Sequence, residues 1–171
     1  MRRGNLVSPS RILNIEMGGI TMIDRGERAR ELFMEGYNCA QAVACAFCDV
    51  TGMDIDAAAR MASSFGGGLG RLREVCGTVS GAALVLGIVE GYSEPGDMEA
   101  KKAHYARVQE YARRFTEING TIICRELLKG VDTSVGGEPA ERTPEYYAKR
   151  PCPALAACAA KILEEMLENG K

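Results

Sequence analysis

VCGTVSGAALVLGIV, residues 75–89, is the stretch that decides the fold of this chain. If it is helical, it is apolar on nearly all sides, which is typical of a helix buried at the centre of a protein. It is too short to cross a bilayer, because a membrane-spanning helix needs about 20 apolar residues. Gly77 and Gly81 have no side chains, so neighbouring helices can approach closely there. The stretch therefore predicts a buried central helix.

Amphipathic helices are predicted on both sides of this stretch. Apolar residues recur there at spacings of three and four, and glycines or capping residues such as Asn38, Asp54 and Asp97 separate the segments. No strand pattern and no repeat is found. We expect an all-α, single-domain bundle of about six helices around the central one. The helices are expected at residues 24–35, 39–51, 54–65, 97–119 and 153–167, with a short one at 124–128 and a polar loop at 132–150.

The length of the chain is sufficient for a single domain. A protein of 171 residues can bury roughly 70% of the surface that its unfolded chain exposes, so it needs no disulfides to supply a core. We expect one helical four-cysteine domain over residues 22–171. Residues 1–21 show no clear period and are expected to be a disordered N-terminal arm or the product of a start assigned too far upstream, with Met17 and Met22 as alternative starts.

Charge and composition exclude several classes of protein. The net charge is −2 and no segment collects a run of like charges, which argues against binding nucleic acid through its phosphates. No secretory signal and no transmembrane segment is found. A cytoplasmic location is expected. In that reducing compartment, clustered cysteines serve redox chemistry or metal binding more often than structural bridges, and an odd total of seven argues against complete pairing.

Four of the seven cysteines lie beside predicted helix starts: Cys39, Cys76, Cys124 and Cys152. A helix N-terminus carries a partial positive charge and unpaired N–H groups, so it favours a thiolate over a thiol. Thiolates are both nucleophiles and metal ligands. Taken singly, each cysteine is explained equally well as a small buried apolar side chain. The recurrence of one local context at four positions favours shared chemistry.

The other cysteines are interpreted as packing residues. Cys45 and Cys48 form a Cys-x-x-Cys motif, but it falls in the last part of a predicted helix rather than after a strand. The helix dipole disfavours a thiolate at that end. Cys158 lies inside the last predicted helix.

A glycine-rich loop, Gly66-Gly67-Gly68-Leu69-Gly70, precedes the central helix. It matches neither a phosphate-binding loop nor a dinucleotide fingerprint, since the required Lys and third Gly are missing and no strand precedes it. The exposed backbone N–H groups of Gly66, Gly67 and Gly68 could still hold an anion, a cluster sulfur or a substrate carboxylate. The alternative is a tight connection between buried helices.

Five segments, in order, resemble the C_GCAxxG_C_C family, a group described as redox-active with four characteristic cysteines. They are GYNCAQ at 36–41, FGGGLG at 65–70, CGTVSG at 76–81, CRELL at 124–128 and PCP at 151–153. The resemblance covers about residues 23–167.

The family's four cysteines carry over to Cys39, Cys76, Cys124 and Cys152. Thr78 departs from the Cys-Gly-Ala-x-x-Gly motif, where alanine is expected. The resemblance implies redox activity, but it names no reaction.

Two kinds of function fit these residues. In the first, the four cysteines converge and either cycle between dithiol and disulfide or hold an iron–sulfur cluster, for which four thiolates are the usual ligands. Cys39 and Cys76 are then expected as the central pair, with Cys124 and Cys152 as resolving thiols or further ligands. In the second, the same four hold a structural zinc ion. A small-molecule-binding bundle is a third option. The redox partner stays unidentified, and a homodimer remains open.

Overall fold

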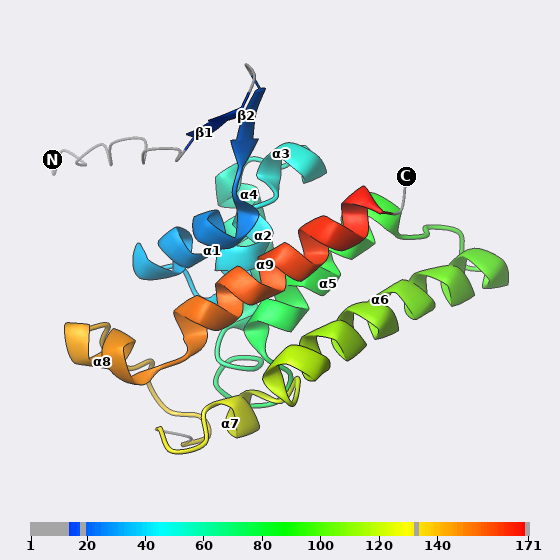
Figure 1. The fold of residues 1–171 in the computed structure, drawn as a ribbon. Helices are drawn as coiled ribbons and strands as arrows, with labels where there is room; N and C mark the ends of the chain where they lie inside the picture. Colours follow the sequence, from blue (N-terminus) through cyan, green and yellow to red (C-terminus); the bar gives the residue numbers. More distant parts are fainter. Residues whose placement is uncertain (1–13, 18–19, 132–133, 170–171) are drawn as a thin grey trace, which may run out of the picture.

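The predicted central helix is α5, Gly77–Glu90, in the computed structural model of the chain, which describes residues 14–17, 20–131 and 134–169 (Figure 1). Most of this helix is buried as far as Leu86, whereas Ile88 and Val89 in its last turn are exposed. The prediction of a buried helix is therefore confirmed for all but its C-terminal end.

The all-α class is confirmed. The described residues contain nine α-helices and one 3₁₀ turn. Besides α5, these are α1 Arg25–Met34, α2 Cys39–Cys45, α3 Cys48–Thr51, α4 Ile55–Ala62, η1 Ser63–Phe65, α6 Met98–Asn119, α7 Cys124–Leu127, α8 Pro144–Lys149 and α9 Cys152–Glu168.

The predicted helix count was too low for two physical reasons. The helix expected from residue 39 breaks before Phe47, and the carbonyl of Ala46 accepts a hydrogen bond (2.7 Å) from the Arg25 guanidinium. That bond comes from a distant part of the chain, so local periodicity does not reveal it. In the expected polar loop, Thr143 caps α8 by accepting a hydrogen bond from the Tyr146 N–H.

A short hairpin precedes the helices, although no strand was expected. Strands β1, Asn14–Met17, and β2, Ile20–Ile23, pair antiparallel with Asn14 opposite Ile23. Strands of four residues are too short to show a distinctive alternation in the sequence. Residues 1–13 of the predicted arm lie outside the described residues.

Two helix pairs form the centre of the bundle. Helix α9 packs most extensively on α1 and also contacts α2, α5 and α6, while α5 packs most extensively on α2 (Figure 1). A Cβ atom on Gly81 would lie 2.5 Å from the carbonyl oxygen of Ala40. The predicted close approach at Gly81 is thus confirmed, and it brings the N-terminal ends of α2 and α5 together.

The predicted helix caps are also present. Asn38 accepts hydrogen bonds from the N–H groups of Ala40 and Gln41, and the Gln41 side chain accepts one from the Asn38 N–H in return. Asp54 and Asp97 cap α4 and α6. None of the helices in the described part of the chain combines the length and the apolar character that crossing a membrane requires.

Candidate functional site

The four predicted site cysteines lie at helix starts, as expected. Cys39, Cys124 and Cys152 are the first residues of α2, α7 and α9, and Cys76 is the residue before α5. Figure 1 shows α5 and α9 starting at the end of the bundle where α7 lies. The fold therefore directs cysteines from four separate segments to one end.

These cysteines form a cluster, called here the cysteine cluster: Cys39, Cys76, Cys124 and Cys152. Cys39 is close enough to the other three cysteines for their charges to affect one another's pKa values. The same holds for Cys152 with Cys76 and Cys124. All are free thiols. Cys76, Cys124 and Cys152 are buried, and Cys39 is partly buried. The predicted convergence is thus present in the fold.

Backbone pairing holds two members of the cluster in register. Val75 and Ile123 form an isolated antiparallel bridge. Next to it, the Cys76 N–H donates to the Ile122 carbonyl and the Cys124 N–H donates to the Glu74 carbonyl, each at 2.7 Å. The start of α5 and the start of α7 are therefore held side by side by backbone hydrogen bonds.

Cys39 and Cys152 interact directly. The Cys39 thiol donates a hydrogen bond to Cys152, which lowers the pKa of Cys152 and raises the pKa of Cys39 well above its ordinary value. The positive charge of Arg150 also lowers the Cys152 pKa. In addition, Cys152 begins the long helix α9, whose N-terminus favours a thiolate. Cys152 is therefore the more acidic thiol of the pair, and Cys39 holds its proton to higher pH.

The expectation that all four helix starts would favour thiolates was wrong for three of the cysteines. Burial raises the pKa of Cys76 to about 12, although the Thr78 hydroxyl lies 3.2 Å from its sulfur. Burial also raises the pKa of Cys124, which a hydrogen bond from Arg73 only partly offsets. The pKa of Cys39 is raised first because its thiol donates a hydrogen bond to Cys152, and second because the thiol is buried. Loss of hydration outweighs the helix dipole at these sites.

The structure also changes the expected pairing. Cys39 was predicted to pair with Cys76, but its hydrogen-bond partner is Cys152. In the described residues, no three or more His, Cys, Asp or Glu side chains are grouped so that they could hold a metal ion.

The glycine loop contacts the cluster through backbone and Cα atoms. The Gly67 N–H donates a hydrogen bond to the Cys39 sulfur. A Cβ atom on Gly68 would lie 2.7 Å from the Cβ of Cys124, and one on Gly77 would lie 3.0 Å from the Cβ of Cys39. The loop is therefore packed closely against the cysteines, which agrees with the alternative of a tight connection between buried helices. Binding of a ligand by Gly66, Gly67 and Gly68 stays a prediction.

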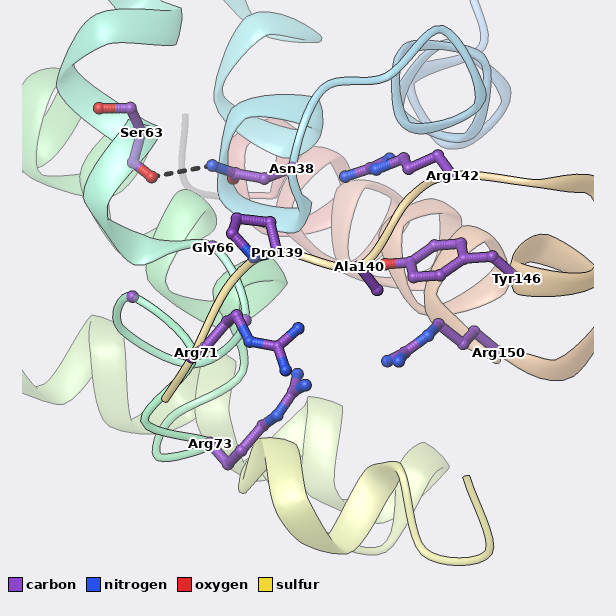
Figure 2. A pocket seen from close by; sticks show the side chains of 13 residues that line it. Asn38, Ser63, Gly66, Arg71, Arg73, Pro139, Ala140, Arg142, Tyr146 and Arg150 are labelled. Atoms are coloured by element: carbon purple, nitrogen blue, oxygen red, sulfur yellow. Dashed lines mark hydrogen bonds between the residues drawn. The ribbon is translucent and has the colours of Figure 1, made fainter. Parts of the chain in front are cut away.

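A cavity of about 280 Å³ opens beside the loop (Figure 2). Gly66 and Gly67 line it, whereas Gly68 faces Cys124. Asn38, the residue before Cys39, also lines it and donates a hydrogen bond to the Ser63 carbonyl (2.9 Å). The cavity and the cysteine cluster therefore share a wall.

Four arginines are among the described residues lining this cavity: Arg71, Arg73, Arg142 and Arg150. Figure 2 shows Arg71 and Arg73 on the loop side and Arg150 across from them, with their guanidinium groups directed into the same space. Sequence reasoning missed Arg142 and Arg150, because they come from a segment that was expected to be a polar loop. Nothing in the sequence around Arg142 indicated a role at the site. The one signal for Arg150 was its position two residues before Cys152.

The Cys45–Cys48 pair differs in detail from its prediction. Helix α2 ends at Cys45 and Cys48 begins α3, so the motif bridges two helices rather than ending one. The two thiols interact by a hydrogen bond, and burial raises the pKa of Cys45 to about 12 and also raises that of Cys48. Cys158 is half-buried and accepts a hydrogen bond from Asn119. Burial therefore disfavours a thiolate at Cys45 and at Cys48.

Comparison with known proteins gave one result. Searches of curated proteins and of solved structures found no match. A family model described as "Putative redox-active protein (C_GCAxxG_C_C)" matches residues 37–166, which include all four members of the cysteine cluster. Because this match covers most of the sequence, the chain belongs to the C_GCAxxG_C_C family, as its motifs had indicated.

Proposed function

We propose that this protein is a thiol–disulfide redox protein whose working pair is Cys39 and Cys152. The observation that carries the proposal is the meeting of the first residues of α2 and α9, Cys39 and Cys152, as free thiols in one largely buried cluster. Their interaction lowers the pKa of Cys152. A thiolate with a neighbouring protonated thiol is the arrangement that disulfide exchange needs.

The exchange proceeds in two steps. The Cys152 thiolate attacks one sulfur of a partner disulfide, forming a mixed disulfide and releasing the other partner sulfur as a thiolate. Cys39 then transfers its proton to that thiolate and attacks the Cys152 sulfur, which releases the second partner thiolate; this takes up a proton from solvent. Two protein thiols are oxidised to one disulfide, and one partner disulfide is reduced to two thiols.

Cys76 and Cys124 have a supporting role in this proposal. Their raised pKa values keep them protonated, and their sulfurs lie within electrostatic reach of Cys39. A neutral, buried neighbour does not compete with Cys152 for the partner disulfide. We place the reaction in the cytoplasm, where the resting state would be the dithiol.

Metal analysis and thiol titration test this proposal together. Protein purified without oxygen is analysed for iron, acid-labile sulfide and zinc, and its thiols are counted before and after treatment with a small disulfide. We expect metal-free protein that loses two thiols, a loss that Cys152→Ser abolishes and Cys158→Ser leaves unchanged. Stoichiometric zinc, or iron with sulfide, bound through the cysteine cluster would overturn the proposal in favour of a metal site.

A further inference from the structure

One nitrogen of the buried Arg73 guanidinium has no hydrogen-bond partner among the described residues. The residue is only 3% exposed, and its Nη2 atom has no hydrogen-bond partner. Its Nε donates to the Ser134 carbonyl at 3.1 Å. Leaving a charged donor both buried and unsatisfied is costly, because the group loses its hydration without compensation. An unsatisfied donor on a residue that lines a cavity indicates a ligand that accepts the missing hydrogen bond.

The charge of the cavity identifies the kind of ligand. Arg71, Arg142 and Arg150 line it together with Arg73, and no Asp or Glu is among its described lining residues. Contacts with aromatic rings hold two of these groups in place: Arg150 lies 4.4 Å from the centre of the Tyr146 ring, and Arg142 lies 4.5 Å from that of Phe33. The planar donors of these guanidinium groups match a carboxylate or a phosphate.

The backbone that presents these arginines is strained. Arg71 and Arg73 have φ angles of +67° and +61°, a region that side-chain-bearing residues rarely adopt. Hydrogen bonds within the loop maintain it: the Arg71 N–H donates to the Gly66 carbonyl and the Arg73 N–H to that of Gly67. Strain of this kind persists where the surrounding structure enforces it, and it is concentrated at ligand sites.

The same arginines act on the cysteine cluster. Arg73 hydrogen-bonds Cys124, and the positive charges of Arg150 and Arg142 lower the pKa of Cys152 and of Cys39 respectively. The cavity that these groups line therefore lies next to the cysteine cluster, with Asn38 and Gly67 between the cavity and Cys39. Its volume of about 280 Å³ is close to the lower end of small-molecule sites, about 300–1,000 Å³.

We propose that this cavity binds the carboxylate group of a small acidic disulfide and so selects the substrate of the Cys39–Cys152 pair. Arg73 is the principal contact and Arg150 the second. This inference rests on the proposed function, since it names the substrate class for that same site.

A charge series of disulfides tests the selection. The reduced protein is oxidised by 3,3′-dithiodipropionate, which is dianionic, by 2-hydroxyethyl disulfide, which is neutral, and by cystamine, which is dicationic. Each rate is divided by the rate of the same disulfide with a free small thiol, which removes intrinsic reactivity. We expect the acidic disulfide to be preferred over the neutral one by about ten-fold or more, as for one charged hydrogen bond. Equal normalised rates would overturn the inference.

Two variants assign the preference to the cavity. Arg73→Gln and Arg150→Gln should each reduce the preference about ten-fold, mainly by slowing the acidic disulfide. Arg113→Gln is the matched control, because Arg113 lies on α6, is 55% exposed and does not line the cavity. Should Arg73→Gln fail to fold, Arg150→Gln decides alone. A preference that persists in the folded Arg150→Gln protein contradicts the assignment.

A binding measurement separates the redox function from the carboxylate site. Binding of 3,3′-dithiodipropionate to the Cys39→Ser/Cys152→Ser protein is measured by calorimetry, because this protein cannot exchange disulfides through the pair. If this protein binds the disulfide and the added change Arg150→Gln weakens the binding, the carboxylate site is supported. This holds even if the parent protein does not cycle between dithiol and disulfide. No binding, combined with rapid exchange in the parent protein, would leave the redox function standing and overturn the substrate assignment.

Discussion

Cys39, at the start of α2, donates a hydrogen bond to Cys152, at the start of α9. This contact joins two helices whose first residues are distant in sequence, and it makes Cys152 the more acidic of two chemically identical thiols. The position of Cys39 depends on α5, because a Cβ on Gly77 would lie 3.0 Å from the Cβ of Cys39. Close helix packing and thiol chemistry are therefore linked.

The titration of Cys152 should depend on Cys39. Cys152 changes from thiol to thiolate as the pH rises through its lowered pKa, so the exchange rate should rise over a pH range below that of an ordinary thiol. Cys39→Ala removes the hydrogen bond that stabilises the thiolate, so the rise should move to higher pH. Ultraviolet absorbance of the thiolate measures this shift. Cys158→Ala is the control, and an unchanged midpoint in Cys39→Ala would contradict the assigned donor.

Two glycines of α5 should respond oppositely to alanine. In Gly81→Ala, the new Cβ would lie 2.5 Å from the Ala40 carbonyl oxygen, and overpacking of this kind costs about 1–3 kcal/mol. In Gly87→Ala, the new Cβ meets nothing within 4 Å, so the better helix propensity of alanine should stabilise the fold by about 0.5–1 kcal/mol. Chemical denaturation of both variants measures the two effects. Equal changes would mean that α2 and α5 are not closely packed.

Gly68 should be more sensitive to alanine than a glycine with similar backbone angles elsewhere. Gly68 and Gly120 have φ angles of +70° and +84°, which cost any alanine about 1–2 kcal/mol. At Gly68 the Cβ would in addition lie 2.7 Å from the Cβ of Cys124, whereas at Gly120 it meets nothing within 4 Å. We expect Gly68→Ala to lower the free energy of unfolding further than Gly120→Ala. The same loss in both variants would contradict the contact with Cys124.

The hydroxyl of Tyr111 should stabilise the packing of α6 on α9. Tyr111 is buried and its hydroxyl donates a hydrogen bond to the Ala159 carbonyl at 3.1 Å. Tyr111→Phe should therefore lower the free energy of unfolding by about 1 kcal/mol. Tyr105→Phe, at a tyrosine that is 51% exposed, should change it by less than about 0.5 kcal/mol. Thermal or denaturant unfolding gives both values, and similar losses would refute the role of the buried bond.

Local chemistry made part of this structure predictable. The N-caps Asn38, Asp54 and Asp97 begin their helices because their side chains accept hydrogen bonds from the first free N–H groups. The apolar run at 75–89 predicted the buried helix, and Gly77 and Gly81 predicted a close approach of neighbouring backbones, which the structure shows for α2. These features depend on residues that lie near one another in sequence.

The features that the sequence did not predict depend on contacts between distant segments of the chain. The break at Phe47 accompanies a hydrogen bond from Arg25, and the protonation of Cys76 and Cys124 follows from how deeply the fold buries them. A helix start predicts a local dipole, but it does not predict the loss of water around the sulfur. For the same reason, the sequence led us to expect Cys76 as the partner of Cys39. The contact of Cys39 with Cys152 depends on how α2 and α9 pack in the fold.

Disulfide mapping by mass spectrometry tests the central claim most directly. Reduced protein is oxidised by a small disulfide, remaining thiols are blocked at low pH, and the bridged peptides are identified. We predict a single bridge between Cys39 and Cys152, with Cys76 and Cys124 recovered as blocked thiols. A bridge between Cys39 and Cys76, or no bridge within the cysteine cluster, would contradict it.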